Sequence, residues 1–213
     1  MKTILCYGDS NTWGHNPRTK ERYDHKTRWP MVLKSLLNKG CAEDDPDWWI
    51  VEEGLCGRTS CREDDVEGDR NGLRQLIPIL ESHKPLDIVI VLLGTNDLKI
   101  RFRPTPYDIA RGAQRIVTAV QDSRTGPGNT SPKVIMICPP PTVEADGFKH
   151  LFGNSVELSK QLPPQFEALA KESGAIFLDA GKHIKTSTAD GIHLEPEDHR
   201  KLAEAVAEIV KTL

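Results

Sequence analysis

Three residues, one near the start of this sequence and two near its end, have side chains that suit the cleavage of an ester. Ser10 offers a hydroxyl that can attack a carbonyl carbon, and Gly8 permits a tight turn in front of it. His193 can take the proton from that hydroxyl, because the pKa of an unperturbed imidazole lies near neutrality. Asp190 precedes His193 across a glycine and can hold its imidazole in one tautomer. Together these residues predict a catalytic triad.

An ester-cleaving serine also needs hydrogen-bond donors for the oxygen that becomes negatively charged during the reaction. The backbone N–H of Gly57 has no side chain beside it, and the side-chain amide of Asn96 offers a second donor. The backbone N–H of Ser10 offers a third. Each residue alone is more often part of a turn, a loop or a helix cap. Their joint occurrence favours an oxyanion hole formed by Ser10, Gly57 and Asn96.

Strands and helices that could position these residues alternate along the chain. Short apolar runs predict strands at residues 3–7, 48–52, 87–93, 133–138 and 175–178. Apolar residues at helical spacing predict helices at 29–37, 73–83, 109–120, 158–171 and 196–210, with Pro163 and Pro164 kinking or splitting the fourth. This alternation implies an α/β fold, a three-layer α/β/α sandwich with parallel strands. Ligands of such sheets bind beyond the carboxyl ends of the strands, where the polar segments lie.

The polar segments resemble the sequence blocks of the SGNH, or GDSL-type, hydrolase family. The matching residues, in chain order, are Gly8-Asp9-Ser10, Gly57, Gly94-Thr95-Asn96-Asp97 and Asp190-Gly191-Ile192-His193. The match spans nearly the whole chain. Asn11 departs from the name-giving motif, which has leucine at this position, but the position varies within the family.

The resemblance implies a flavodoxin-like, five-stranded parallel sheet with the strand order 2-1-3-4-5. By position it implies Ser10 as nucleophile, His193 as base and Asp190 as orienting acid, with oxyanion donors at Ser10, Gly57 and Asn96. The runs around these residues are similar to a bacterial arylesterase and acyltransferase branch, whose members favour short acyl chains and are often oligomeric. We therefore expect short-chain or aryl esters as substrates, acyl transfer beside hydrolysis, and a homo-oligomer.

Apolar residues near the proposed site predict a substrate pocket that includes Trp13, Phe152, Ile192 and Leu194. The segment 139–165 could form a lid or pocket wall, or it could pack in the core or against another subunit. Arg58 could contact a polar substrate group or pair with a nearby carboxylate such as Glu53 or Asp64.

The remaining charged residues and histidines suggest no further site. The acidic runs at 44–45 and 63–65 are expected to be solvated loops, and His199 is expected at an exposed position of the last helix. The five cysteines are odd in number, which argues against a disulfide framework, and they lack zinc spacing. We expect no metal site and no organic cofactor.

Length and composition suit one globular domain spanning residues 1–213, since 38% of the 213 residues are hydrophobic. A net charge of −3 without a basic block gives no support for a nucleic-acid partner. No apolar run approaches the roughly 20 residues of a membrane span, so a cytoplasmic location is the default. The expected partner is a small-molecule ester.

Other functions remain open from the sequence. A thioesterase or lysophospholipase acting on long acyl chains, or a carbohydrate deacetylase, would use the same triad. A non-catalytic, flavodoxin-like binding module could hold a phosphate at the turn 8–11. That turn lacks the glycine-lysine pattern of phosphate loops, and the module would leave Asn96 and His193 without a role.

Overall fold

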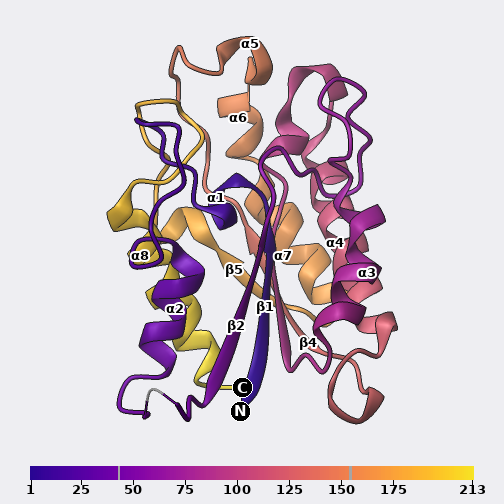
Figure 1. The fold of residues 1–213 in the computed structure, drawn as a ribbon. Helices are drawn as coiled ribbons and strands as arrows, with labels where there is room; N and C mark the ends of the chain where they lie inside the picture. The colour runs from indigo at the N-terminus through magenta and orange to yellow at the C-terminus, as the bar shows by residue number, and fades with distance from the viewer. Residues whose placement is uncertain (43, 154) are drawn as a thin grey trace.

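A computed structural model describes residues 1–42, 44–153 and 155–213 (Figure 1). The strands are β1 (Lys2–Gly8), β2 (Trp48–Gly54), β3 (Ile88–Leu92), β4 (Lys133–Cys138) and β5 (Ile176–Asp179). The helices are α1 (Ser10–Trp13), α2 (Trp29–Leu37), α3 (Gly72–His83), α4 (Pro106–Ser123), α5 (Lys149–Phe152), α6 (Ser155–Ser159), α7 (Leu162–Glu172) and α8 (Pro196–Val210). Single 3₁₀ turns are η1 (Asn96–Leu98), η2 (Ile100–Phe102), η3 (Pro127–Asn129) and η4 (Ala180–Lys182).

The five strands form one parallel sheet in the order β2-β1-β3-β4-β5, which confirms the predicted fold class and strand order. β3 is central and buried along its whole length, as its continuous aliphatic sequence predicts. At the end of β1, Gly8 is paired with Gly54 of β2 and Leu92 of β3. Because these strands run the same way and end together, the segments that follow them meet at one edge of the sheet.

Alternate side chains of β1 enter two separate cores, one on each face of the sheet. Leu5 and Tyr7 pack with apolar residues of α3, α4 and α7. Ile4 and Cys6 pack with residues of α2 and α8 on the opposite face, and Figure 1 shows these two groups of helices on either side of the sheet. Burial of this apolar surface, at about 25 cal/mol per Å², is the main force that fixes the sheet between its helices.

Helix boundaries follow local signals in the sequence. Thr105 caps α4: its hydroxyl accepts the N–H of Asp108, whose carboxylate accepts the Thr105 N–H in return. The predicted helix 158–171 is split, since α6 ends at Ser159 and α7 begins at Leu162. Pro163 lies in the first turn of α7, where its missing N–H has no helical partner to lose.

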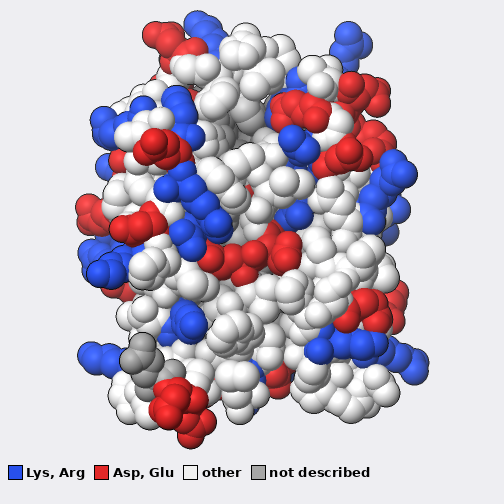
Figure 2. All heavy atoms as spheres, in the orientation of Figure 1, with Lys and Arg blue, Asp and Glu red and all other residues white. Residues whose placement is uncertain are grey.

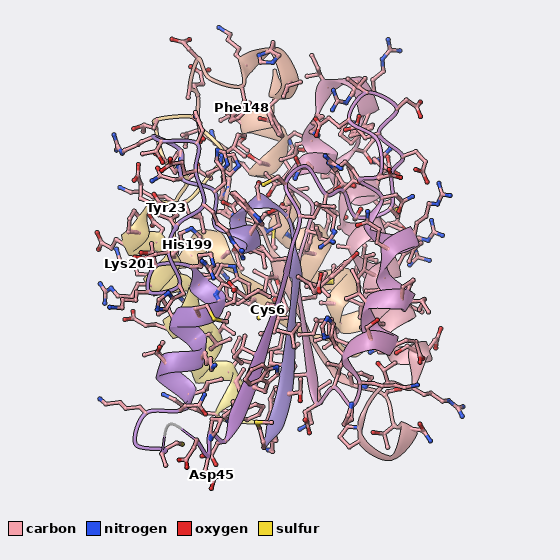
Figure 3. The ribbon with its side chains drawn as sticks, in the orientation of Figure 1. Cys6, Tyr23, Asp45, Phe148, His199 and Lys201 are labelled. Atoms are coloured by element: carbon pink, nitrogen blue, oxygen red, sulfur yellow. The ribbon has the colours of Figure 1, made fainter. Side chains whose placement is uncertain are left out.

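The prediction that His199 is exposed was wrong. This residue of α8 is fully buried, and its Nδ1 accepts the backbone N–H of Trp29 at 3.3 Å. Tyr23 packs edge-on against its ring, with 5.4 Å between ring centroids (Figure 3). Burial lowers the pKa of His199 to about 3, so the ring is neutral. His199 therefore joins α8 to α2, a role that its place on an amphipathic helix does not reveal.

Charged side chains of both signs are interspersed over the face shown in Figure 2. The longest helix, α4, has 18 residues and buries only one of its faces. Within the described part of the chain, no helix combines the length and the apolarity that crossing a bilayer requires.

Candidate active site

Ser10 is separated from the end of β1 by one residue and lies at the first position of the single-turn helix α1. Asp9 caps this turn, because its Oδ1 accepts the backbone N–H of Asn11 at 2.9 Å. The side chain of Asn11 donates to the carbonyl of Ile192 at 3.3 Å, which ties the Ser10 turn to the loop that carries His193. The Ser10 side chain is thus held at the end of a buried strand by bonds on both sides.

Asp190 and His193 belong to residues 187–193, here called the base loop. His193 Nε2 lies 2.9 Å from Ser10 Oγ, and its Nδ1 lies 2.7 Å from Asp190 Oδ2. The other oxygen of Asp190 accepts the backbone N–H groups of Ile192 and His193, at 3.1 and 3.0 Å. The structure therefore brings together the hydroxyl, imidazole and carboxylate that the sequence predicts as a triad.

Backbone shape and charge both hold the base loop in place. Gly191 has φ +82°, and a Cβ there would overlap the carbonyl of Val143, so only glycine fits. Burial alone would raise the pKa of Asp190, but hydrogen bonds and the charge of His193 outweigh it and lower this pKa to about 2. The ionised Asp190 keeps a proton on Nδ1 of His193 and leaves Nε2 to accept the proton of Ser10.

The ring of His193 is packed between two other rings. The His15 ring lies 4.1 Å away between centroids, and the Phe148 ring meets it edge-on at 5.8 Å. Figure 3 shows Phe148 above the ends of the strands. Burial and the nearby His193 lower the pKa of His15 to about 4, so this ring is neutral. Sequence spacing gave no partner for His15, because the contact joins opposite ends of the chain.

Gly57 and Asn96 follow β2 and β3 and lie beside Ser10 in one cavity. The Asn96 Nδ2 is buried and has no hydrogen-bond partner among the described residues. Gly57 has φ +83°, and a Cβ there would lie 2.5 Å from Glu67 Oε2 and 3.0 Å from Arg70 Nε. The N–H of Ser10 is the first of α1, so it has no carbonyl partner within that helix. The three predicted oxyanion donors are thus brought together.

A buried carboxylate joins the Gly57 loop (residues 55–60) to the Asn96 loop (residues 94–97). Asp97 Oδ1 accepts the hydroxyl of Ser60 at 2.6 Å, and Asp97 Oδ2 accepts the Ser60 backbone N–H at 2.9 Å. Burial raises the pKa of Asp97 above its usual range, although these hydrogen bonds oppose the shift. The relative positions of Gly57 and Asn96 depend on this bridge.

Arg58 holds the ends of two strands together. Its Nη1 donates to the carbonyls of Gly8 and Glu53, at 2.9 and 2.5 Å, and its guanidinium lies 4.3 Å from the ring centroid of Tyr7. Burial lowers the pKa of Arg58 from its ordinary value. Within the described residues Arg58 forms no ion pair with Glu53 or Asp64 and does not line the cavity, so neither role considered from the sequence is observed.

The cavity in front of Ser10 has a volume of about 220 Å³. Its lining residues are Ser10, His15, Cys56, Gly57, Glu67, Arg70, Asn96, Lys99, Phe148, Leu151, Phe152, Ile192 and His193. Of the four pocket residues that the sequence predicts, Phe152 and Ile192 line this cavity. Leu194 instead packs in the core beside α2 and α8, and Trp13 is not among the lining residues.

Two chemically different walls enclose the cavity. One is apolar and comes from the segment 139–165, which supplies Phe148, Leu151 and Phe152. The other is charged and consists of Glu67, Arg70 and Lys99. Of the roles open to the segment 139–165, the structure shows two, a pocket wall and core packing, since Phe152 also belongs to the hydrophobic core.

An ion-pair cluster that includes Lys99 and Glu67 of the charged wall was not predicted from the sequence. Lys99 is almost completely buried, and its Nζ lies 3.1 Å from Asp64 Oδ2 and 2.5 Å from Glu67 Oε1. Arg101 Nη2 reaches both carboxylates at 2.6 Å. Asp64 is buried, so the expected solvated loop at 63–65 was wrong for this residue. Burial alone would raise the pKa of Asp64, but the hydrogen bonds and charges of these cations outweigh it and lower this pKa to about 2.

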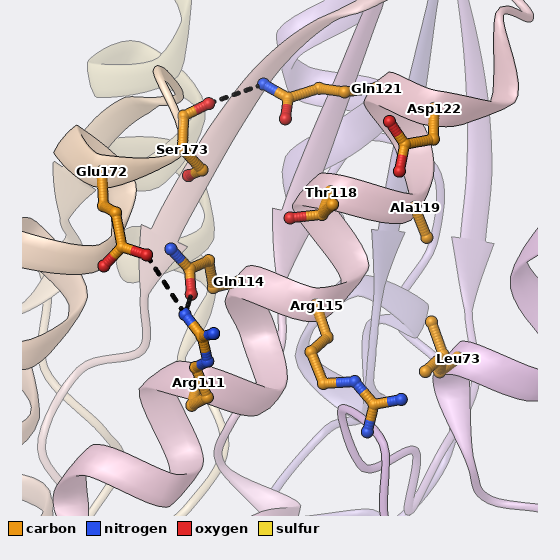
Figure 4. Close-up of a pocket in the computed structure, with 10 residues that line it drawn as sticks. All are labelled: Leu73, Arg111, Gln114, Arg115, Thr118, Ala119, Gln121, Asp122, Glu172 and Ser173. Atoms are coloured by element: carbon orange, nitrogen blue, oxygen red, sulfur yellow. Dashed lines mark hydrogen bonds and ion pairs between the residues drawn. The ribbon is translucent and has the colours of Figure 1, made fainter.

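A second hollow lies away from Ser10. Residues of α3, α4 and the end of α7 line a space of about 620 Å³ (Figure 4). Within this hollow, Nη1 of Arg111 lies 3.3 Å from Oε1 of Glu172. None of the residues that line this hollow belongs to the polar segments that follow the strands. The residues that can perform chemistry therefore lie at the smaller cavity, in front of Ser10, which is the candidate active site.

Comparisons with known proteins agree with this geometry. The model of the GDSL-like lipase/acylhydrolase family matches residues 6–201. Among solved structures, the chain is 39% identical to the M. smegmatis aryl esterase, covers 100% of both chains, and superposes with a TM-score of 0.92.

A carbohydrate acetylesterase from Sinorhizobium meliloti is 37% identical over 100% of this chain and 99% of its own, with a TM-score of 0.92. A putative arylesterase from Agrobacterium tumefaciens is also 37% identical, over 100% and 99% of the two chains, with a TM-score of 0.89. A comparison with curated proteins gave no match.

Proposed function

The chain belongs to the GDSL-like lipase/acylhydrolase family and is a carboxylic ester hydrolase, and we propose that Ser10, His193 and Asp190 are its catalytic triad. The observation that carries the proposal is the continuous set of contacts from Ser10 Oγ through the imidazole of His193 to the Asp190 carboxylate, at 2.9 and 2.7 Å. The alternative of a non-catalytic binding module is set aside.

In the proposed reaction Ser10 Oγ attacks the ester carbonyl while its proton passes to His193 Nε2. The carbonyl oxygen becomes negatively charged and accepts hydrogen bonds from Asn96 Nδ2 and the N–H groups of Gly57 and Ser10. His193 then gives the proton to the leaving alcohol, and the acyl group stays on Ser10. Water, or another alcohol, attacks the acyl-serine by the same steps in reverse order, with His193 again as base.

Small esters are the proposed substrates, because the cavity in front of Ser10 has only about 220 Å³. Drug-sized ligands need about 300–1,000 Å³. An acetyl or propionyl group therefore fits, with its methyl end against the apolar wall of Phe148, Leu151 and Phe152. The long acyl chains of a lysophospholipase or a fatty acyl thioesterase do not fit without a large movement of that wall.

A carbohydrate deacetylase is the second candidate, and the charged wall favours it. Glu67, Arg70 and Lys99 line the cavity together with the apolar residues, and such side chains can hydrogen-bond the hydroxyls of a sugar. One of the similar structures is a carbohydrate acetylesterase. The acyl specificity is the same for both candidates, and only the alcohol differs.

Further properties stay predictions. We propose that residues 1–213 form one catalytic domain, that the protein is cytoplasmic, and that it forms a homo-oligomer. Size-exclusion chromatography with light scattering tests the oligomeric state directly.

The triad is tested with Ser10→Ala protein and a series of p-nitrophenyl esters. We expect the variant to lose turnover of the acetyl ester by a factor of about 10⁴ or more while its far-UV circular dichroism is unchanged. A fluorophosphonate should label the wild-type protein at Ser10 and leave the variant unlabelled. Near-normal turnover by the variant would refute the mechanism, and faster turnover of octanoyl than acetyl esters would refute the proposed substrate size.

A further inference from the structure

Three side chains that commonly ligate metal ions lie together beside Ser10. They are His15, Asp190 and His193, and one ligand atom from each lies within 4.8 Å of the other two. We propose that these residues form an inhibitory site for zinc or a similar divalent transition-metal ion, which blocks the catalytic triad when it binds. The inhibitory effect of the ion rests on the proposed function. The binding site itself does not, because it is defined by the three side chains.

The geometry needs only a small adjustment to hold zinc. Zinc binds imidazole nitrogen and carboxylate oxygen at about 2.0–2.2 Å in tetrahedral sites, which places neighbouring ligand atoms roughly 3.4 Å apart. The widest pair of the group must therefore close by little more than ~1 Å. His15 can make this movement, because its Nε2 is buried with no hydrogen-bond partner among the described residues and its ring is only half-buried as a whole. Turning the ring therefore breaks no side-chain hydrogen bond within the described part of the chain.

The ligand types also suit a cation. Metal ions bind neutral imidazole and ionised carboxylate. His15 and His193 supply two imidazoles, and Asp190 supplies the carboxylate. An opposing charge close to the ligands is Lys20, whose Nζ lies 3.7 Å from Asp190 Oδ2. Its side chain is 54% exposed and can turn into solvent when an ion arrives.

Binding of the ion stops the reaction through His193. If the ion bonds to Nδ1, it displaces the proton that Asp190 holds there; if it bonds to Nε2, it takes the lone pair that accepts the proton of Ser10. In both cases His193 no longer acts as the base for Ser10. The His15 and His193 rings line the cavity, so the ion can enter from it, and a water molecule can complete the tetrahedron on that side.

The first test measures binding without turnover. Isothermal titration of zinc chloride into Ser10→Ala protein should show one ion per chain. The added substitution His15→Phe keeps a ring against His193 but removes the ligand atom, and it should weaken binding by about tenfold or more. His25→Ala, which removes an exposed histidine, should leave the affinity unchanged. Equal zinc affinity with and without His15 would overturn the proposal.

The second test measures inhibition in the active protein. Zinc should inhibit hydrolysis of p-nitrophenyl acetate, EDTA should restore it, and millimolar Mg²⁺, which prefers oxygen ligands, should have no effect. Each variant is compared with its own zinc-free rate. His15→Phe and His15→Leu should both require about tenfold more zinc or higher.

Two outcomes of the inhibition test separate the alternatives. If Cys56→Ser abolishes inhibition while both His15 variants remain as sensitive as the wild type, the thiol in the cavity binds the ion and the proposal fails. If the wild-type protein hydrolyses no ester at all, the proposed function fails, while the calorimetric comparison still decides whether His15 belongs to a metal site.

Discussion

His193 and Asp190 lie three residues apart on one loop, whereas the proposed oxyanion donors come from loops whose bridging residues, Ser60 and Asp97, are 37 positions apart. In the base loop, the Asp190 carboxylate accepts two backbone N–H groups and contacts the imidazole of His193, so hydrogen bonds within the loop fix its conformation. The Gly57 and Asn96 loops, both within the described residues, contain no carboxylate that binds the backbone of its own loop in this way. They depend on a carboxylate buried between them.

Each half of the site is therefore sensitive to a different kind of substitution. A change within the base loop alters the chemistry of His193 directly and leaves the rest of the fold with its contacts. A change in the Ser60–Asp97 bridge removes hydrogen bonds from a fully buried carboxylate, so it lowers stability and displaces two donors together. The predictions below test this contrast.

The largest effect is expected in the base loop. Asp190→Asn preserves the shape of the side chain, but the neutral amide no longer favours a proton on His193 Nδ1. We expect kcat for p-nitrophenyl acetate to fall by about 10⁴, with a small change in KM. Asp146→Asn, a change at an exposed acid on a neighbouring loop, is the matched control and should retain full activity. A loss below tenfold in Asp190→Asn would mean that the carboxylate does not orient His193.

The next effect concerns a single oxyanion donor. Asn96→Ala removes the Nδ2 amide, and we expect kcat to fall by about 10²–10³ while KM changes little. The free energy of unfolding should change only slightly, because this amide has no hydrogen-bond partner among the described residues. Steady-state kinetics and urea unfolding measure the two quantities. A rise in KM at constant kcat would assign Asn96 to substrate binding instead of the transition state.

Substitutions in the Ser60–Asp97 bridge between the two oxyanion loops should lower the free energy of unfolding. Ser60→Ala and Asp97→Asn should each lower the free energy of unfolding by about 1–3 kcal/mol. The double variant should lose less than the sum, because both changes remove the same hydrogen bonds. Urea unfolding of the four proteins measures this coupling. Strictly additive losses would show that the bridge does not join the loops energetically.

The contrast also explains which parts were predictable from the sequence. The alternation of strands and helices followed from apolar periodicity, and the strand order followed from the resemblance to the SGNH family. The proposed triad followed from motifs in which neighbouring residues act together, such as Asp190 and His193. Phe152 and Ile192 both line the cavity, as predicted: Ile192 belongs to the motif that contains His193, and Phe152 lies in the long segment after the fourth predicted strand. Leu194 is adjacent to His193 but points into the core, and adjacency in sequence does not show on which side of a loop a residue lies.

Contacts between distant segments could not be predicted. His15 lies against His193, and Lys99 binds Asp64 and Glu67, although nothing in their local spacing differs from that of surface residues. The charge of the buried Lys99 is balanced by carboxylates of another loop, and the sequence does not show which loops meet. The charged wall of the cavity was missed for this reason.

The smallest expected effect is on the pH dependence of stability, and it has opposite signs at Asp9 and Asp190. Burial raises the pKa of Asp9 from its ordinary value of 3.8 to about 6, against the hydrogen bond from Asn11, and its buried Oδ2 has no partner among the described residues. The folded chain therefore holds a proton on Asp9 that the unfolded chain releases between pH 4 and 6. The contribution of Asp9 to stability is thus present below pH 4 and lost as the pH rises through 6.

Asp9→Asn cannot lose that proton, so its stability relative to the wild type should improve from pH 4 to 6, by about 1–2 kcal/mol, and then stay level. For Asp190, whose pKa is lowered to about 2, the contribution is complete above about pH 4 and is lost as the pH falls towards 2. Asp190→Asn should therefore differ from the wild type most above pH 4 and least near pH 2. Urea unfolding from pH 2.5 to 7 separates the two windows. If the difference between Asp9→Asn and the wild type does not vary between pH 4 and 6, Asp9 is ionised in the folded chain, and the Ser10 turn carries a buried negative charge beside the nucleophile.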